Sequence, residues 1–293
     1  MKFENFGQMV PWWGKVMAKI LLSRLPAGYP VWQKLGLFRH GAMDQAEYAL
    51  NVFKSHVERA GLQGSLAGKT VLELGPGDSV ASAIIACVNG ARAILVDVDH
   101  FATGAPESYL PLIANLREKG YKTPDVSQCK KLEDLLSACD AIYLTDGLKS
   151  LKKIDNASID LIYSQAVLEH LRRHEFLQIQ QECARILGGT GVCSHRVDLR
   201  DHLGGGLNNL RFSENLWESE FFVQSGFYTN RIQLQGMVSF FEQAGFKADL
   251  VEVRQWKELP IKRSRLADEF KNIPDQTLNI AGFDVLLKHE SKR

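Results

Sequence analysis

The chain has 293 residues, of which 45% are hydrophobic and 24% charged, and its formal net charge at pH 7 is +1. These are the proportions of an ordinary globular protein, and the length allows one large α/β domain with additions. The near balance of charge excludes a general electrostatic attraction to nucleic acid, so no nucleic-acid partner is predicted.

An amphipathic helix is the first predicted element, beginning near Pro11 and ending before Pro26. Its apolar residues recur at helical spacing, while Lys15, Lys19 and Ser23 line another face. A basic, tryptophan-rich helix of this kind can lie in a membrane interface. The alternative, which is favoured here because apolar stripes usually face a core, is that the helix packs on the main domain or across a dimer.

A glycine-rich turn follows the first predicted strand, which covers residues 71–74 and precedes a helix over 79–88. Gly75 and Gly77 lie where backbone passes close to a ligand, as at a nucleotide or nucleoside site at the carboxyl end of a strand. Val80 stands where a dinucleotide fingerprint has its third glycine, which disfavours a dinucleotide. A second strand over 93–98 brings Asp97 to the same edge, where a carboxylate suits a ribose diol.

The remaining elements follow from periodicity and from turn residues. A helix over 45–60 precedes the glycine turn, after a loop at 38–44. Helices are predicted over 107–119, 131–139, 175–187 and 230–244, the third of them closed by Gly188 and Gly189. Strands are predicted over 141–144, 191–197, 247–256 and 281–288, together with a buried strand that starts at Ile159. Residues 198–229 are expected to form a long irregular insertion.

Three blocks of this sequence resemble the class I S-adenosylmethionine-dependent methyltransferases. They are Glu73-Leu74-Gly75-Pro76-Gly77, Leu95-Val96-Asp97, and the run from Ile159 to His170 that ends in Leu-Glu-His. The resemblance implies a Rossmann-like seven-stranded sheet with helices on both faces and a reversed last hairpin. It also implies a helical extension and cofactor cover at 1–64, a methyltransferase domain at 65–293, and a substrate-binding insertion at 198–229.

The cofactor implied by this resemblance is S-adenosylmethionine, and the implied binding residues lie on the loops at the ends of the strands. They are Glu73, Gly75, Pro76, Gly77, Asp97, Val98, Asp146, Gly147, Ser164 and Gln165. Helices ahead of the first strand often cover the cofactor in this family, which makes His40 a candidate for that cover.

The insertion is predicted to bind the methyl acceptor, because loops at the carboxyl ends of strands form the mouth of such a site. Its mixture of aromatic, amide and charged groups suits a sugar, whose apolar faces stack on rings and whose hydroxyls bind polar side chains. The predicted substrate-binding residues are His40, His170, Arg196, Asn208, Arg211, Trp217, Tyr228, Asn230 and Arg231.

A sugar hydroxyl is a poor nucleophile, so methyl transfer to it needs a positioned base. His202 is the favoured base and His195 the second candidate, with Asp198 or Asp201 orienting the imidazole. A divalent metal held by Asp198, Asp201 and His202 is an alternative, but the spacing fits no fixed ligand pattern, so no metal is predicted.

The whole sequence is also similar to bacterial methyltransferases of surface-glycan assembly, which implies O-methylation of a sugar hydroxyl in a glycan or its precursor. Two alternatives stay open. One is transfer to a small nonsugar metabolite or a lipid quinone, and the other is a noncatalytic cofactor-binding scaffold. The acceptor, the oligomeric state and the base are left undecided.

The cysteines, the N-terminus and the apolar runs bear on the compartment. Five cysteines without a close pair indicate reduced thiols rather than a zinc site or a disulfide framework. The N-terminal residues lack the basic, apolar and cleavage-site pattern of a secretory leader, so none is expected, and no apolar run reaches membrane-spanning length. We therefore expect a cytoplasmic protein, with contact at the inner face of the membrane as the further option that the N-terminal helix allows.

Overall fold

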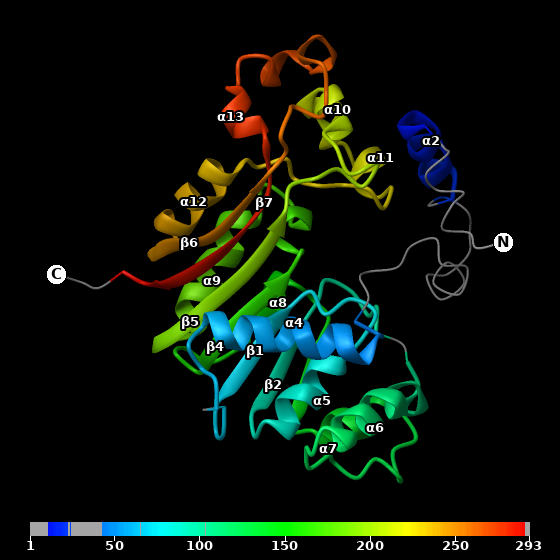
Figure 1. Cartoon of the computed structure of the whole chain (residues 1–293), viewed down its shortest axis with the longest axis vertical. Coiled ribbons are helices and arrows are strands. Elements are labelled where there is room, and N and C mark those ends of the chain that lie inside the picture. The colour runs from blue at the N-terminus through cyan, green and yellow to red at the C-terminus, as the bar shows by residue number, and fades with distance from the viewer. Residues whose placement is uncertain (1–10, 23, 25–42, 65, 103, 291–293) are drawn as a thin grey trace.

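The computed structural model describes residues 11–22, 24, 43–64, 66–102 and 104–290 (Figure 1). Predictions that fall on other residues, including the loop position His40 and the start of the N-terminal segment, lie outside this described part. Within the described residues, no helix is both long and apolar enough to cross a membrane. All five cysteines are free thiols.

A seven-stranded sheet forms the centre of the molecule, with the strand order β3-β2-β1-β4-β5-β7-β6. Its first five strands are parallel, and β7 runs antiparallel to both β5 and β6. This confirms the predicted Rossmann-like seven-stranded sheet with its reversed last hairpin. The strands are β1 (Thr70–Leu74), β2 (Arg92–Val96), β3 (Ala141–Leu144), β4 (Ile159–Gln165), β5 (Leu187–Asp198), β6 (Phe246–Gln255) and β7 (Ile280–His289).

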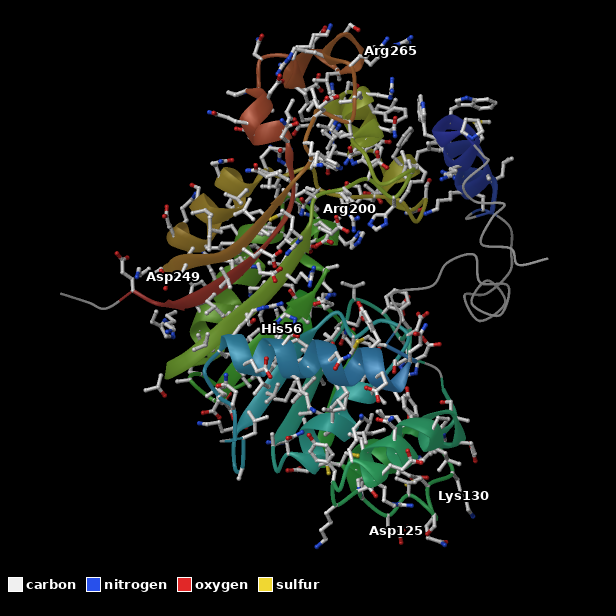
Figure 2. The ribbon with its side chains drawn as sticks, in the orientation of Figure 1. His56, Asp125, Lys130, Arg200, Asp249 and Arg265 are labelled. Carbon is white, nitrogen blue, oxygen red and sulfur yellow. The ribbon has the colours of Figure 1, made fainter. Side chains whose placement is uncertain are left out.

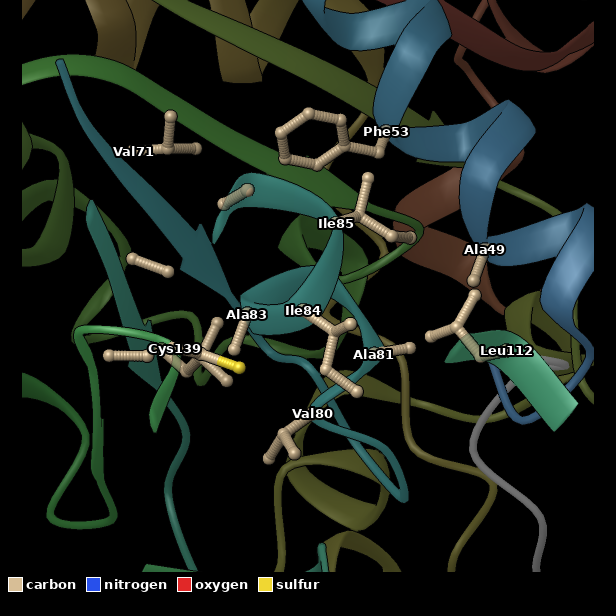
Figure 3. Close-up of a cluster of buried hydrophobic side chains, with 14 of the residues drawn as sticks. Ala49, Phe53, Val71, Val80, Ala81, Ala83, Ile84, Ile85, Leu112 and Cys139 are labelled. Atoms are coloured by element: carbon tan, nitrogen blue, oxygen red, sulfur yellow. The ribbon is translucent and has the colours of Figure 1, made fainter. Parts of the chain in front are cut away.

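Helices cover the two faces of the sheet, and a separate hydrophobic cluster fills each interface. One face carries α4 (Ala46–Arg59), α5 (Ala81–Val88), the 3-10 turn η2 (Pro106–Tyr109) with α6 (Leu110–Glu118), and α7 (Leu132–Ala138). Figure 3 shows this cluster, in which Phe53 of α4 and Ile85 of α5 meet Val71 of β1. The other face carries α8 (Leu148–Leu151), α9 (Phe176–Ile186) and α12 (Leu234–Gln243).

Two predicted helices are longer than the structure allows. The helix predicted to end at Leu187 stops at Ile186, because Ser158 N–H donates to the Ile186 carbonyl and pulls the chain into β5. Gly188 and Gly189 therefore belong to a strand rather than to a helix cap. The helix predicted from Asn230 begins at Leu234, because the Asn230 amide is held on the Leu168 and Leu171 carbonyls.

Short helices occupy the insertion that was predicted to be irregular. They are η4 (Asn208–Arg211), α10 (Glu214–Trp217) and α11 (Glu220–Val223). A second addition, which the sequence patterns did not reveal, joins β6 to β7 and contains η5 (Arg263–Arg265), η6 (Asp268–Phe270) and α13 (Asp275–Leu278). The two additions share a cluster in which Leu210 packs with Phe270 and Leu278.

The described parts of the predicted N-terminal extension pack in two different places. Helix α4 lies against the sheet and shares its core. Helix α2 (Trp12–Leu22) packs its Val16 side against Trp217 and Phe222 of the insertion. Packing on the main domain is thus the arrangement seen in this structure, while the outward face of α2 exposes Trp13, Met17 and Leu21.

Candidate cofactor and acceptor site

The turn after β1 has a backbone that requires glycine. Gly75 and Gly77 have φ values of +67° and +64°, in the left-handed region that side chains disfavour. Gly75 N–H donates to the Val96 carbonyl at 2.8 Å, which ties the turn to β2. A Cβ on Gly75 would lie 2.6 Å from Cγ1 of Val167, so the loop after β4 also excludes a side chain there.

Asp97 braces this turn from the end of β2. One carboxylate oxygen accepts the Gly77 N–H at 3.0 Å and the other accepts the Val98 N–H at 2.7 Å. A carboxylate accepts hydrogen bonds on both oxygens, which is the chemistry that suits the two hydroxyls of a ribose. The pairing of β1 with β2 therefore places the acidic group where the sequence predicted it, beside the glycine turn.

Glu73 lies beneath the turn rather than at its surface. Its side chain is 2% exposed and bonds to the Ser82 hydroxyl of α5. Burial raises its pKa to about 7, and the negative charge of Asp97 acts in the same direction. Glu73 thus supports the loop from inside the core. This placement does not favour a direct contact between Glu73 and a ligand.

Other predicted cofactor residues gather at the same edge of the sheet. Gly147 N–H donates to the Asp97 carbonyl at 2.8 Å, and Val98, which is 66% exposed, lies next to Gly147. The Asp146 carboxylate forms an exposed ion pair with Lys153 at 3.2 Å. The ends of β1, β2 and β3 therefore bring Gly75–Gly77, Asp97–Val98 and Asp146–Gly147 together.

Ser164 and Gln165 end β4 and face opposite sides of the sheet. The Ser164 hydroxyl is fully buried and bonds to Nδ1 of His195 at 2.8 Å, on the face covered by α12. Gln165 is half-buried on the α4 side, where its Oε1 lies 3.2 Å from Nε2 of His56. Gln165 is consequently better placed than Ser164 to reach a ligand at the open edge.

His56 of α4 is a residue that the sequence patterns did not single out. Its Nδ1 lies 2.8 Å from the Ser194 hydroxyl, and burial lowers its pKa to about 3, so the ring is neutral (Figure 2). Because Gln165 Oε1 can only accept, Nε2 of His56 carries the proton. The Gln165 carbonyl is thereby held by His56, and its amide N–H groups are left for another partner.

Two histidines meet at the mouth of the site. The rings of His202 and His170 lie 4.8 Å apart between centroids, although the two residues are 32 positions apart along the chain. His170 Nδ1 lies 2.9 Å from the Tyr228 carbonyl and therefore carries the proton, which leaves Nε2 as the basic nitrogen. Desolvation and the charge of Lys19 on α2 lower the pKa of His202. The structure thus brings together one predicted catalytic and one predicted substrate residue.

The other predicted catalytic groups are engaged elsewhere. His195 is fully buried, its ring stacks on Phe241 of α12, and burial lowers its pKa to about 3. Asp201 accepts N–H groups from Leu203, Gly205 and Asn208, so it shapes its own loop. This placement does not support His195 as a base, nor Asp201 as the group that orients His202.

Asp198 forms a two-pronged ion pair with Arg200. Its carboxylate accepts hydrogen bonds from Nε of Arg200 at 2.9 Å and from Nη2 at 2.7 Å. Burial acts to raise the pKa of Asp198, but the bonds to Arg200 outweigh it and the pKa is lowered. Figure 2 shows Arg200 where β5 leads into the insertion. Asp198 also contributes a charge that raises the pKa of His202, opposing the effect of Lys19. No group of three or more histidine, cysteine or acidic residues in the described ranges could hold a metal ion.

Glu169 is a second residue that sequence reasoning left without a role. It is 1% exposed, its Oε1 accepts the Asp198 N–H at 3.2 Å, and its Oε2 has no hydrogen-bond partner among the described residues. Burial raises its pKa to about 8, so the carboxyl is largely protonated at neutral pH. The Leu-Glu-His block was the available signal, because Glu169 stands next to His170 in it.

Three predicted substrate residues form the interior of the insertion. Trp217 is fully buried and donates its indole N–H to the Thr229 carbonyl at 2.7 Å. Arg231, at φ +56°, lies between the rings of Trp217 and Phe270 and donates to the Phe212 carbonyl. Asn230 is 1% exposed. In this arrangement all three hold the insertion together and none faces an acceptor.

Of the remaining predicted substrate residues, Arg196, Asn208 and Arg211 are partly exposed, whereas Tyr228 is 6% exposed and therefore buried. Arg211 donates to the Asn208 amide oxygen at 2.9 Å and lies 4.8 Å from the Trp12 ring centroid on α2. The Tyr228 hydroxyl donates to Glu218 at 2.9 Å. Arg196 lies on β5 with 38% of its side chain exposed. Polar groups therefore line the mouth, but the aromatic platform expected of Trp217 is not among them.

In comparisons with known proteins, this chain is similar to solved structures in its three-dimensional arrangement alone. No family model matches the chain, and no curated protein matches it. A methyltransferase from Archaeoglobus fulgidus is 11% identical with a TM-score of 0.43, covering 82% of this chain and 94% of its own. A methyltransferase from Mesorhizobium loti is 13% identical with a TM-score of 0.42, and the match covers 84% of this chain and 98% of that one. Both are described as S-adenosylmethionine dependent.

A third similar structure is a phosphoethanolamine N-methyltransferase from Haemonchus contortus, crystallised with S-adenosylhomocysteine and a phosphorylated amine. It is 13% identical with a TM-score of 0.45, and the match covers 83% of this chain but 53% of that one. At these identities and TM-scores, the likeness is one of overall arrangement.

Proposed function

We propose that this protein is an S-adenosylmethionine-dependent methyltransferase that methylates a hydroxyl group, with His202 as the general base. The observation that carries the proposal is the pairing of the glycine turn with Asp97 at one edge of the sheet and the His170–His202 pair at the mouth. The bound cofactor would supply a methyl group on a sulfonium, an electrophile that needs no activation by the protein.

The residues at the glycine turn fit such a cofactor. The left-handed backbone at Gly75 and Gly77 allows close approach, and the Asp97 carboxylate beside this turn is a group that suits a ribose diol. The half-buried Gln165 offers amide N–H groups because His56 holds its carbonyl. These residues would bind and orient the donor. None of them is basic, which argues against a pyrophosphate group at this turn.

His202 would take the proton from the attacking hydroxyl. Its lowered pKa keeps the imidazole neutral at pH 7, the form that can accept a proton. His170, whose ring lies 4.8 Å from that of His202, would contact the acceptor beside the base. The charge of Asp198 would stabilise the imidazolium that forms, because it favours protonated His202.

A sugar hydroxyl, in a bacterial surface glycan or its precursor, is the acceptor class that we propose. Its support is the polar mouth formed by His170, Asn208 and Arg211 together with the sequence resemblance. The buried Trp217 removes the ring that was expected to stack on the sugar. Assays with labelled methyl donor against sugar and phenolic acceptors separate this class from nonsugar metabolites and quinones.

Replacing the base tests the mechanism. His202→Ala should lower methyl transfer by about 100-fold or more, since general base catalysis contributes about that much. Binding of S-adenosylhomocysteine, measured by calorimetry, should stay within about twofold. The wild-type rate should fall as pH drops through the lowered pKa of His202, and the remaining activity of the variant should lack this limb.

The exposed His174, which precedes α9, provides the control variant His174→Ala. It should keep both the rate and the pH profile. Full activity of His202→Ala would sink the assignment of the base, and absence of cofactor binding by the wild-type protein would sink the proposed function as a whole.

A further inference from the structure

Three arginines converge on a single buried aspartate on the α4 side of the sheet. Asp284 of β7 is 1% exposed, with one oxygen 2.8 Å from Nη2 of Arg59 and the other 2.8 Å from Nη1 of Arg254. Nε of Arg196 lies 3.8 Å from the latter oxygen. The three guanidinium groups come from α4, β6 and β5, so tertiary folding creates the cluster.

Strand register and one glycine build this arrangement. Arg196, Asp284 and Glu252 are direct cross-strand neighbours on β5, β7 and β6. Arg254 crosses β7 to donate to the Val197 carbonyl on β5 at 3.2 Å. It can do so because position 282 is glycine, where a Cβ would lie 3.2 Å from Nη2 of Arg254 and 2.6 Å from that carbonyl.

The cluster carries more positive than negative charge. Besides Asp284, the acidic group paired with these arginines among the described residues is Glu252, 3.3 Å from Arg254 and 55% exposed. Nη1 of Arg59 is buried and has no hydrogen-bond partner in the described part of the chain. Excess guanidinium charge with unused N–H donors is the chemistry that binds an oxyanion, and arginine forks fit such groups with two parallel bonds.

The cluster is partly exposed, and the strand register connects it to the glycine turn of the proposed cofactor site. The side chains of Arg196 and Arg254 are 38% and 26% exposed. Arg196 is the cross-strand partner of Gln165, the last residue of β4, whose neighbour Ser164 pairs with Leu74 just before the glycine turn.

We propose that Arg59, Arg196 and Arg254 form a binding site for a phosphoryl group, carried by the methyl acceptor. A phosphoryl group offers three acceptor oxygens and up to two negative charges, which matches several converging guanidinium forks better than a carboxylate does. Its assignment to the acceptor rests on the proposed methyl transfer, whereas the anion site itself stands on the cluster. The acceptor is then a phosphorylated compound, such as a sugar phosphate.

Calorimetric titration with inorganic phosphate, pyrophosphate and acetate at constant ionic strength tests the site without any methyl donor. The wild-type protein should bind pyrophosphate and phosphate, with acetate at least tenfold weaker. Arg196→Gln should weaken the phosphate interaction by about tenfold or more. Arg117→Gln, at an exposed position of α6 where the side chain bonds to Thr123, should leave it unchanged.

A second variant, which is expected to bind phosphate more tightly, distinguishes an effect on the site from damage to folding. Asp284→Asn removes the competing carboxylate, so phosphate should bind more tightly while the melting temperature without anion falls. Equal binding by the wild type and Arg196→Gln, tighter binding of acetate, or no gain in Asp284→Asn would each overturn the site. Retained phosphate binding with a failed methyl transfer assay would overturn the proposed function and leave the anion site standing.

Discussion

Desolvation keeps two titratable residues at the mouth of the site in their neutral forms. Glu169 and His202 lie on adjoining segments, yet burial raises the pKa of the carboxyl to about 8, whereas the imidazole is kept neutral by desolvation and by Lys19. Both groups are therefore largely uncharged near neutral pH. A site held this way can accept a proton at His202 without a competing carboxylate at position 169.

The buried carboxyl of Glu169 should make stability depend on pH. Below about pH 4.3, the pKa of an unperturbed glutamate, both folded and unfolded chains carry the proton. As pH rises toward 8, the unfolded chain loses its proton and the native chain keeps it, so the free energy of unfolding falls. Glu169→Gln keeps the acceptor for the Asp198 N–H and removes this penalty.

We expect Glu169→Gln to gain stability relative to the wild type between pH 5 and 8, on the order of a few kcal/mol at the upper end. Urea denaturation at several pH values measures the difference. Glu133→Gln, on an exposed position of α7, should show no such trend. A constant difference between Glu169→Gln and the wild type across this range would show that the carboxyl ionises freely in the folded protein.

At the scale of elements, the insertion is a small domain-like unit with its own core. Trp217 is fully buried at its centre, and Val16 of α2, Phe222 and Phe227 pack around it. Lys19 of α2 also donates to the Gly226 carbonyl at 3.2 Å. The outward face of α2, with Trp13 and Met17 exposed, leaves membrane contact as a prediction.

Trp217→Ala should loosen the insertion and release α2. The cavity and the lost bond to the Thr229 carbonyl together cost about 3–5 kcal/mol, more than a peripheral unit of this size can lose. Hydrogen exchange should rise across residues 198–229 and 12–22 while β1, β4 and β5 stay protected. Equal exchange in the sheet and the insertion would mean that the two unfold together.

At the scale of the whole molecule, α4 belongs to the domain and not to a detachable extension. Leu50, Phe53 and Val57 are buried against α5 and the sheet, and His56 reaches Ser194 on β5. Arg59, at the end of the same helix, pairs with Asp284. A boundary at residue 64 therefore separates the sheet from one of its covering helices.

A chain consisting of residues 65–293 should fail to fold cooperatively, whereas residues 43–293 should fold. Each large apolar side chain of α4 contributes about 1.5–3 kcal/mol by burial, and together they approach the 5–15 kcal/mol that stabilise a typical domain. Thermal unfolding followed by circular dichroism compares the two chains. A sharp transition at an unchanged temperature in the shorter chain would place the boundary at 64 after all.

The fold and half of the site were predictable because their signals are local. Apolar runs, the Gly75–Gly77 turn and an acidic residue after β2 each depend on neighbours in the chain, and parallel strands then bring their ends to one edge. The roles of His195 and Asp201 were not predictable in this way. Strand alternation buries His195 on the α12 face, and the fold of the loop turns Asp201 toward its own backbone.

The sequence by itself determined the order and type of the main elements, the glycine turn and its carboxylate, since these follow from short-range patterns. Only the tertiary structure decided which polar groups meet. It set His170 against His202, His56 against Gln165, and three arginines around Asp284, because each contact joins segments far apart in the chain. Such contacts are fixed by strand register and packing, which no local pattern encodes.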